Sequence, residues 1–110
     1  MTNELTTDEI KQLAEACGLG LVKPMYDLQL MHCFDEEMNR YCIFDPINNN
    51  ADNHKVLMAL VKLCNKRDCR MHPHNNRLFI EDWDGKYIFT ADEFSNESIA
   101  RALLAVLKIK

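Results

Sequence analysis

The sequence predicts an α+β domain, in which a small antiparallel sheet packs with about three helices in an α/β sandwich. Apolar residues recur at helical spacing in three segments, near residues 6–17, 50–64 and 96–108. Between the last two, residues 69–91 contain two turn signals that divide the segment into three short strands. The chain of 110 residues fits a single domain over residues 1–110.

Local signals mark the ends of the first helix. Thr6 followed by Glu9 is a capping-box pattern, in which side chains and backbone at a helix start satisfy each other. Gly18 comes just after the last apolar residue, where glycine is favoured because it adopts the left-handed C-cap conformation easily. We therefore expect a helix over residues 6–17.

Residues 21–44 are β-favouring but irregular. The strand-like residues 40–44 follow an acidic segment, 35–37, that is polar enough to turn. We expect a loose hairpin at a sheet edge, and a long loop containing Pro24 is the alternative. Asp45-Pro46 then ends the strand, because proline cannot donate a backbone hydrogen bond to a sheet.

The asparagines after Pro46 predict the start of the next helix. Asn side chains accept hydrogen bonds from helix N-termini, and Asp52 suits the positive end of the helix dipole. The last helix, 96–108, has Ser95 as its expected N-cap.

Two turn dipeptides predict the register of the three later strands. Asn75-Asn76 and Asp84-Gly85 both suit two-residue type I′ turns, and opposite residues then share one face of the sheet. The expected core face carries Met71, Pro73, Leu78, Ile80, Tyr87 and Phe89. The expected opposite face carries Arg70, His72, His74, Arg77, Phe79, Glu81, Trp83, Lys86, Ile88 and Thr90.

Composition limits the classes of function. The net charge of −4 argues against a dedicated nucleic-acid binder, although residues 62–77 are locally basic. The first residues are polar and acidic and no long apolar run is present, so we expect neither a signal peptide nor a membrane span. Five cysteines without a repeated spacing suggest reduced thiols and a cytoplasmic protein.

Two segments resemble a known family. Phe44-Asp45-Pro46-Ile47 with Asp52 ahead of a leucine-bearing helix resembles the "(W/F)-(N/D)-P-(L/I)…D" segment of the phage ABA sandwich family. Residues 97–107 are similar to that family's last helix, and residues 16–18 to the end of its first helix. The resemblance implies an α/β sandwich and a phage or prophage origin, hence the cytoplasm of a host cell. It supplies no catalytic residues.

The sequence predicts neither a metal site nor a catalytic site. Zinc ligands are available in Cys64, Cys69, His72 and His74, but their spacing matches no common finger. Cys33 beside His32 would point to the opposite side of a strand, which leaves the thiol without a base. Asp45, Glu81, Asp82 and Asp84 could form paired carboxylates, but a turn role for Asp45 and a hairpin position for Asp84 are the favoured interpretation. Without a glycine-rich phosphate loop, we expect no cofactor and no enzyme activity.

The predicted binding residues combine cations with aromatic rings. They are Arg70, His72, Arg77, Phe79, Trp83 and Lys86. Arg, Trp and Phe are enriched at protein interfaces, and the same set suits single-stranded nucleic acid. The third interpretation is that another segment, such as 21–44, covers Phe79 and Trp83.

We expect a phage accessory protein that binds, and inhibits, a host or anti-phage defence component, with a homo-oligomer also compatible. The alternative is a nucleotide or single-stranded nucleic-acid binding protein.

Overall fold

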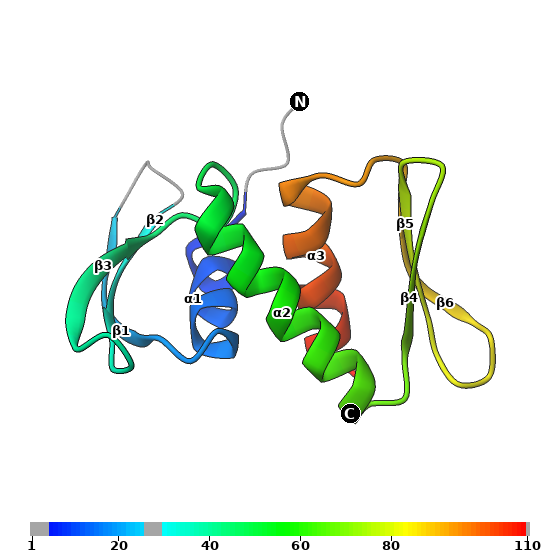
Figure 1. Ribbon diagram of the computed structural model, residues 1–110, viewed down its shortest axis with the longest axis horizontal. Coiled ribbons are helices and arrows are strands. Elements are labelled where there is room, and N and C mark those ends of the chain that lie inside the picture. Colours follow the sequence, from blue (N-terminus) through cyan, green and yellow to red (C-terminus); the bar gives the residue numbers. More distant parts are fainter. Residues whose placement is uncertain (1–4, 26–29, 110) are drawn as a thin grey trace.

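The computed structural model describes residues 5–25 and 30–109 as three layers, with helices between two antiparallel sheets (Figure 1). The elements in chain order are α1 (Thr7–Ala16), β1 (Gly20–Met25), β2 (Leu30–Asp35), β3 (Arg40–Phe44), α2 (Asn50–Lys66), β4 (Arg70–His74), β5 (Arg77–Glu81), β6 (Tyr87–Ala91) and α3 (Asn96–Leu107). We call β1–β2–β3 sheet A and β4–β5–β6 sheet B.

The α+β class is confirmed, and the structure adds a second sheet. Residues 21–44 do form a hairpin, β2–β3, and β1 joins it to make sheet A. Residues 26–29 of this stretch lie outside the described part of the chain. Sheet A and sheet B occupy opposite ends of the longest axis, which spans 40 Å, with the three helices between them (Figure 1).

The predicted caps of α1 are present. The Thr6 N–H donates to Glu9 Oε1 at 2.8 Å, and the Glu9 N–H donates to Thr6 Oγ1 at 3.1 Å. At the other end Gly18 has a φ of +80°, which lets the Leu19 N–H reach the Ala14 carbonyl at 3.0 Å. Short-range sequence signals therefore set both ends of this helix.

The segment between β3 and α2 is a tightly bonded corner. The Asn49 side chain caps α2 by accepting a hydrogen bond from the Asp52 N–H at 3.1 Å. Asp52 in turn accepts one from the Asp45 N–H at 2.9 Å, which ties the end of β3 to the first turn of the helix. The Asp45 side chain accepts a further bond from the Asn48 N–H at 3.0 Å.

One buried amide connects this corner to α3. Asn53 is only 4% exposed, and its Nδ2 donates to the Pro46 carbonyl at 2.7 Å and to the Asn96 carbonyl at 2.9 Å. Asn96 also bonds directly to the corner, since its Nδ2 donates to the Ile47 carbonyl at 2.9 Å. Ser95 caps α3 as expected, and the Ser98 hydroxyl accepts from the Ser95 N–H.

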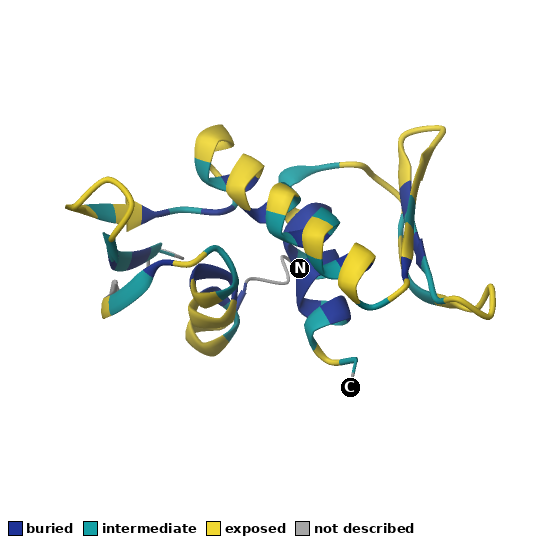
Figure 2. Ribbon diagram, turned by 60° about the horizontal axis from the view of Figure 1, so that its bottom comes forward, coloured by how far each residue is buried: buried dark blue, intermediate teal, exposed yellow. Residues whose placement is uncertain are grey.

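The core lies along the helices and on the sheet faces turned toward them. Its largest fully buried side chains include Phe44 from sheet A, Leu13, Leu60 and Leu103 from the helices, and Leu78 and Ile80 from sheet B. Figure 2 shows the buried segments in dark blue through the helical layer, while the hairpin turns are exposed. Each sheet thus buries one face and leaves the other open.

The first hairpin of sheet B has the predicted register. Arg70 pairs with Glu81 and His74 with Arg77, and the φ angles of Asn75 and Asn76 are +49° and +60°. Both positive values are those that a type I′ turn requires. On the predicted core face Leu78 and Ile80 are fully buried and Met71 and Phe89 pack against the core, whereas Pro73 near the turn is exposed.

The predicted register of the second hairpin is wrong at its turn end. Ile80 pairs with Phe89 as expected, but the register then shifts, so that Glu81 pairs with Tyr87 instead of Ile88. A β-bulge of this kind exchanges the faces of the residues beyond it. Tyr87 therefore leaves the core face and is 59% exposed, while Ile88 turns inward and packs against the core.

Within the described residues, no helix is long and apolar enough to cross a membrane.

We predict that Asn53→Asp lowers the free energy of unfolding by about 3 kcal/mol or more. The substitution keeps the shape of the side chain but replaces a buried double donor with a carboxylate that faces the Pro46 and Asn96 carbonyl oxygens. Urea unfolding followed by circular dichroism measures the change.

The matched control for this prediction is Asn48→Asp. Asn48 is exposed, so the same change of charge there should alter stability by about 0.5 kcal/mol or less. Equal losses in the two variants would show that charge at this corner, rather than the buried amide, controls stability.

Candidate binding face on sheet B

The side of sheet B that points away from the helices carries most of the predicted binding residues (Figure 1). We call it the sheet-B outer face and define it as Arg70, His72, His74, Arg77, Phe79, Glu81, Tyr87 and Thr90, with Trp83 and Lys86 in the adjoining β5–β6 loop. Because successive residues of a strand alternate between faces, burying Leu78 and Ile80 turns Arg77 and Phe79 outward.

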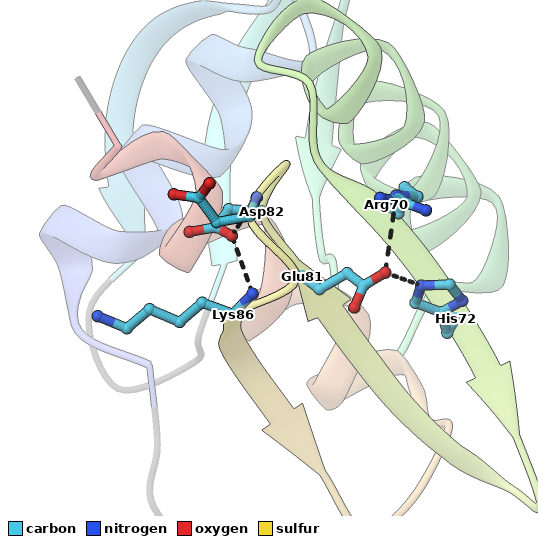
Figure 3. Close-up of polar contacts among 6 residues, drawn as sticks. Arg70, His72, Glu81, Asp82 and Lys86 are labelled. Atoms are coloured by element: carbon cyan, nitrogen blue, oxygen red, sulfur yellow. Dashed lines mark hydrogen bonds and ion pairs between the residues drawn. The ribbon is translucent and has the colours of Figure 1, made fainter.

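The sheet-B outer face is uncovered. Trp83 is 71% exposed, and Phe79 is partly exposed between its neighbours. The interpretation in which residues 21–44 pack over these rings is wrong, because β2 and β3 form sheet A on the opposite side of the helical layer (Figure 1). Four of the six predicted residues share this face, and Trp83 is exposed in the adjoining loop. The prediction for Lys86 is wrong, because the bulge that turns Tyr87 outward turns its neighbour the other way, and the Lys86 side chain extends away from Glu81 and His72 (Figure 3).

An aromatic pair lies at the centre of this face. The rings of Phe79 and Tyr87 are 5.5 Å apart between centroids and tilted by 43°. Sequence reasoning missed Tyr87, because it placed a two-residue turn at Asp84-Gly85. The bulge brings Tyr87 to the same side as Phe79 and adds a third aromatic residue to the surface.

The cause of the longer loop is Asp82. Its Oδ1 accepts hydrogen bonds from the backbone N–H groups of Asp84 and Lys86, both at 3.0 Å, and its own N–H donates to the Lys86 carbonyl at 2.8 Å (Figure 3). An Asp side chain in a turn commonly accepts hydrogen bonds from backbone N–H groups a few residues further along the chain. An Asp two residues before an Asp-Gly dipeptide was therefore the sequence signal that could have indicated the longer loop.

Glu81 neutralises part of the positive charge on this face. One carboxylate oxygen, Oε1, lies 2.8 Å from His72 Nε2 and 3.6 Å from Arg70 Nε (Figure 3). By contrast, the side chains of Arg77 and Lys86 make no ion pair with any residue that the structure describes. Arg77 lies at the start of β5, and Lys86 lies in the β5–β6 loop at the other end of that strand.

Trp83 and Arg77 stand at opposite ends of β5. Trp83 lines a shallow depression with Arg70 and with the end of α2, where Asn65 and Asp68 lie. Arg77 lines a second depression around the Asn75-Asn76 turn, with Pro73 and Phe94 as the apolar part of its wall. A hollow therefore lies near each end of β5, and the aromatic pair lies between the two ends.

The four residues considered for zinc are not brought together. Cys64 and Cys69 are buried at the end of α2, where the Cys69 N–H donates to the Cys64 carbonyl at 2.8 Å. His72 and His74 lie on the exposed side of β4, and His72 contacts Glu81. Among the residues described, no three His, Cys, Asp or Glu side chains are arranged to hold a metal ion.

The cysteines are poor candidates for nucleophiles. Burial raises the pKa of Cys17 and Cys64 from 9.0 to about 11 and that of Cys33 to about 12. A nucleophilic thiol requires the opposite shift, toward the thiolate. His32 lies on the other side of β2 from the buried Cys33, as its position next to it in the chain implied.

The carboxylates considered for catalysis are engaged in local structure. Asp45 and Asp82 accept backbone hydrogen bonds in turns, and Glu81 contacts His72 and Arg70. Asp84 is an exposed residue of the β5–β6 loop. The geometry thus favours recognition on the sheet-B outer face over chemistry at these groups.

We predict that stability falls as pH rises above about 9. The folded protein keeps its buried thiols protonated up to a pKa of about 11 for Cys17 and Cys64 and about 12 for Cys33, whereas the unfolded chain releases those protons near 9.0. A raised pKa in the folded state stabilises the fold fully below 9.0, and this contribution is lost between 9.0 and the folded values.

The measurement is the urea midpoint as a function of pH, for the natural chain and for Cys33→Ala. The variant is less stable because it leaves a cavity, but its stability should decline less steeply with pH. Parallel curves would mean that Cys33 does not contribute to the alkaline loss.

Comparisons of this chain with protein-family models, with curated proteins and with solved structures found no match.

Proposed function

We propose that this chain is a non-enzymatic binding protein that docks a protein partner on the sheet-B outer face. The observation that carries the proposal is the exposure of Trp83, at 71%, beside a face that already presents Phe79, Tyr87 and Arg77. Trp, Tyr and Arg are the residues that most often dominate binding energy at protein interfaces.

The dimensions of the face favour a macromolecule. Arg77 and Trp83 are six residues apart along and just beyond β5, which corresponds to about 20 Å at 3.3 Å per strand residue. Only a ligand of macromolecular size contacts both ends and the aromatic pair together. The shallow depressions at the ends would receive protruding side chains rather than enclose a small molecule.

The charge balance favours a protein over a nucleic acid. The face and its loop contain three cations, Arg70, Arg77 and Lys86, and three carboxylates, Glu81, Asp82 and Asp84. A surface built for phosphates carries a strong excess of positive charge, because each phosphate contact needs a cation. Mixed charges around an aromatic centre are typical of protein interfaces.

The identity of the partner is a finer proposal that rests on sequence resemblance. The Phe44–Ile47 segment and the last helix resemble phage ABA sandwich proteins, so we propose a phage-encoded chain that acts in the host cytoplasm. Its partner would then be a host or anti-phage defence protein whose activity it blocks by occupying a surface.

A nucleotide or single-stranded nucleic acid is the second candidate, and the Phe79–Tyr87 pair is the observation that favours it. The exposed Tyr87 ring and the partly exposed Phe79 ring, with Arg77 nearby on β5, offer bases a stacking surface and a phosphate a counter-charge. Oligonucleotide affinity that falls steeply with salt would support this candidate.

We predict that Trp83→Ala combined with Arg77→Ala abolishes partner capture without unfolding the protein. Both side chains are exposed, so the free energy of unfolding should change by about 0.5 kcal/mol or less. Loss of two interface anchors should cost about 2 kcal/mol or more of binding energy. The measurement is recovery of interacting proteins from a host lysate by the tagged chain, followed by calorimetry with the recovered protein.

The matched control is Met58→Ala combined with Lys62→Ala. It removes an exposed apolar residue and one positive charge from α2, away from sheet B, and should leave capture unchanged. If the control and the sheet-B variant lose the partner equally, the binding site lies elsewhere. An unfolded sheet-B variant would instead show that Trp83 is needed for the fold.

A further inference from the structure

The inner face of sheet A carries two cysteines that lie directly opposite each other. Cys33 is on the central strand β2 and Cys42 is on β3, and the two are Cα partners in the antiparallel ladder. Opposite residues share one face of a sheet, and here that face is the one turned toward the helices, because Cys33 is fully buried and Cys42 packs against the core. Two thiols therefore face each other at the end of the molecule that the proposed binding function does not use.

The spacing of the two strands suits a disulfide bond. Opposite residues of an antiparallel pair have Cα atoms about 4.5 Å or about 5.5 Å apart, depending on whether the two residues are hydrogen-bonded to each other. Both values fall within the range of about 4.4–6.8 Å that disulfides bridge. The register of β2 with β3 is regular from end to end, so the sulfur atoms of Cys33 and Cys42 can be joined without changing it.

The surroundings of the two thiols differ. Burial raises the pKa of Cys33 to about 12, and the negative charge of a Cys42 thiolate is the next largest cause of that shift. Burial also raises the pKa of Cys42, but the Lys55 ammonium acts in the opposite direction, and Asp35 and Asp52 have smaller effects. Cys42 is partly exposed on the last strand of sheet A, whereas Cys33 is fully buried. An oxidant therefore reaches Cys42 first, and Cys33 is the thiol behind it.

The other three cysteines offer less favourable pairings. Cys17, at the C-cap of α1, also raises the pKa of Cys33, but its effect is smaller than that of Cys42, and no ladder holds α1 in register with β2. Cys64 and Cys69 lie near each other at the end of α2. The Cys69 thiol already donates to the Arg67 carbonyl at 3.7 Å, and helical geometry tilts the Cys64 side chain back toward the start of α2.

We propose that Cys33 and Cys42 are a reversible thiol–disulfide pair, which a low-molecular-weight disulfide, oxidised glutathione, converts to a bond across the β2–β3 hairpin. The Cys42 thiolate attacks one sulfur of oxidised glutathione, the S–S bond of glutathione breaks, and the glutathione that leaves takes up the proton that Cys42 released. The Cys33 sulfur then attacks the Cys42 sulfur of the mixed disulfide, and the second glutathione leaves with the Cys33 proton. Two protein thiols are oxidised, and one glutathione disulfide is reduced to two thiols.

The geometry of a sheet makes this bond reversible. The Cβ atoms of opposite residues are about 4.5–5.5 Å apart, whereas those of a disulfide are about 3.5–4.5 Å apart. Forming the bond therefore draws β3 toward β2, and strain of this kind makes a disulfide easier to reduce. The strand β3 can follow, because it lies at the end of the strand order of sheet A. The state of the pair thus depends on the ratio of oxidised to reduced glutathione.

Mass spectrometry of the full chain tests this proposal, after equilibration with mixtures of reduced and oxidised glutathione and alkylation of the remaining thiols. We expect the chain to lose two hydrogens. Trypsin cleaves after Arg40, between the two cysteines, so it should release two linked peptides, whose fragmentation places the bond between Cys33 and Cys42. An excess of reduced glutathione should restore the thiols. A chain that keeps all five thiols, that stops at a glutathione adduct or that joins other cysteines would overturn the proposal.

Two comparisons show whether the folded register is responsible. Concentrated urea separates β2 from β3, so the equilibrium constant for the Cys33–Cys42 bond should fall about tenfold or more in the unfolded chain. Cys42→Ser should leave Cys33 reduced, whereas Cys17→Ser should oxidise as the natural chain does, and circular dichroism verifies that both variants fold. An equal equilibrium constant in urea, or a Cys17→Ser variant that folds but forms no bond, contradicts the pairing across the ladder.

Discussion

The fold depends on the side-chain amide of Asn53. Buried in the first turns of α2, it holds the Pro46 carbonyl, just after sheet A, and the Asn96 carbonyl, just after the strands of sheet B. These partners lie 7 and 43 residues away in the chain. An amide NH₂ group has two donors, and both are used, so the burial of this polar group is compensated. The position of α3 against α2 follows, and with it the position of sheet B.

The helical layer separates two surfaces of different chemistry. Sheet B presents aromatic rings among mixed charges, with Glu81 balancing Arg70 and His72. Sheet A presents the exposed side chains of Tyr41 and Ile43, with the Tyr41 ring in contact with His32 and Phe34. The first kind of surface suits recognition of another protein. The two lie on opposite ends of the molecule, so binding at one surface leaves the other accessible (Figure 1).

Several parts of the structure were predictable from local sequence, for reasons that act over a few residues. Thr6 and Glu9 cap α1, Asn49 and Ser95 cap the later helices, and Asn75-Asn76 forms the first turn of sheet B. Four of the six predicted binding residues, Arg70, His72, Arg77 and Phe79, share one face of sheet B. Tyr87 was missed because its exposure depends on a bulge, which a two-residue turn would not contain. The bulge accompanies a longer loop in which the Asp82 side chain accepts hydrogen bonds from the Asp84 and Lys86 N–H groups.

The sequence alone thus determined the class of the fold, the helix ends, the first sheet-B hairpin and most of one candidate binding face. Helix capping, hydrophobic periodicity and turn formation depend on residues that are close together in the chain, so they can be recognised in the sequence. Only the tertiary structure decided that residues 21–44 form a separate sheet, that the helices lie between the two sheets, and that Trp83 is uncovered. Those outcomes depend on which apolar surfaces meet across long separations, and on one buried amide, Asn53, whose partners no local pattern could identify.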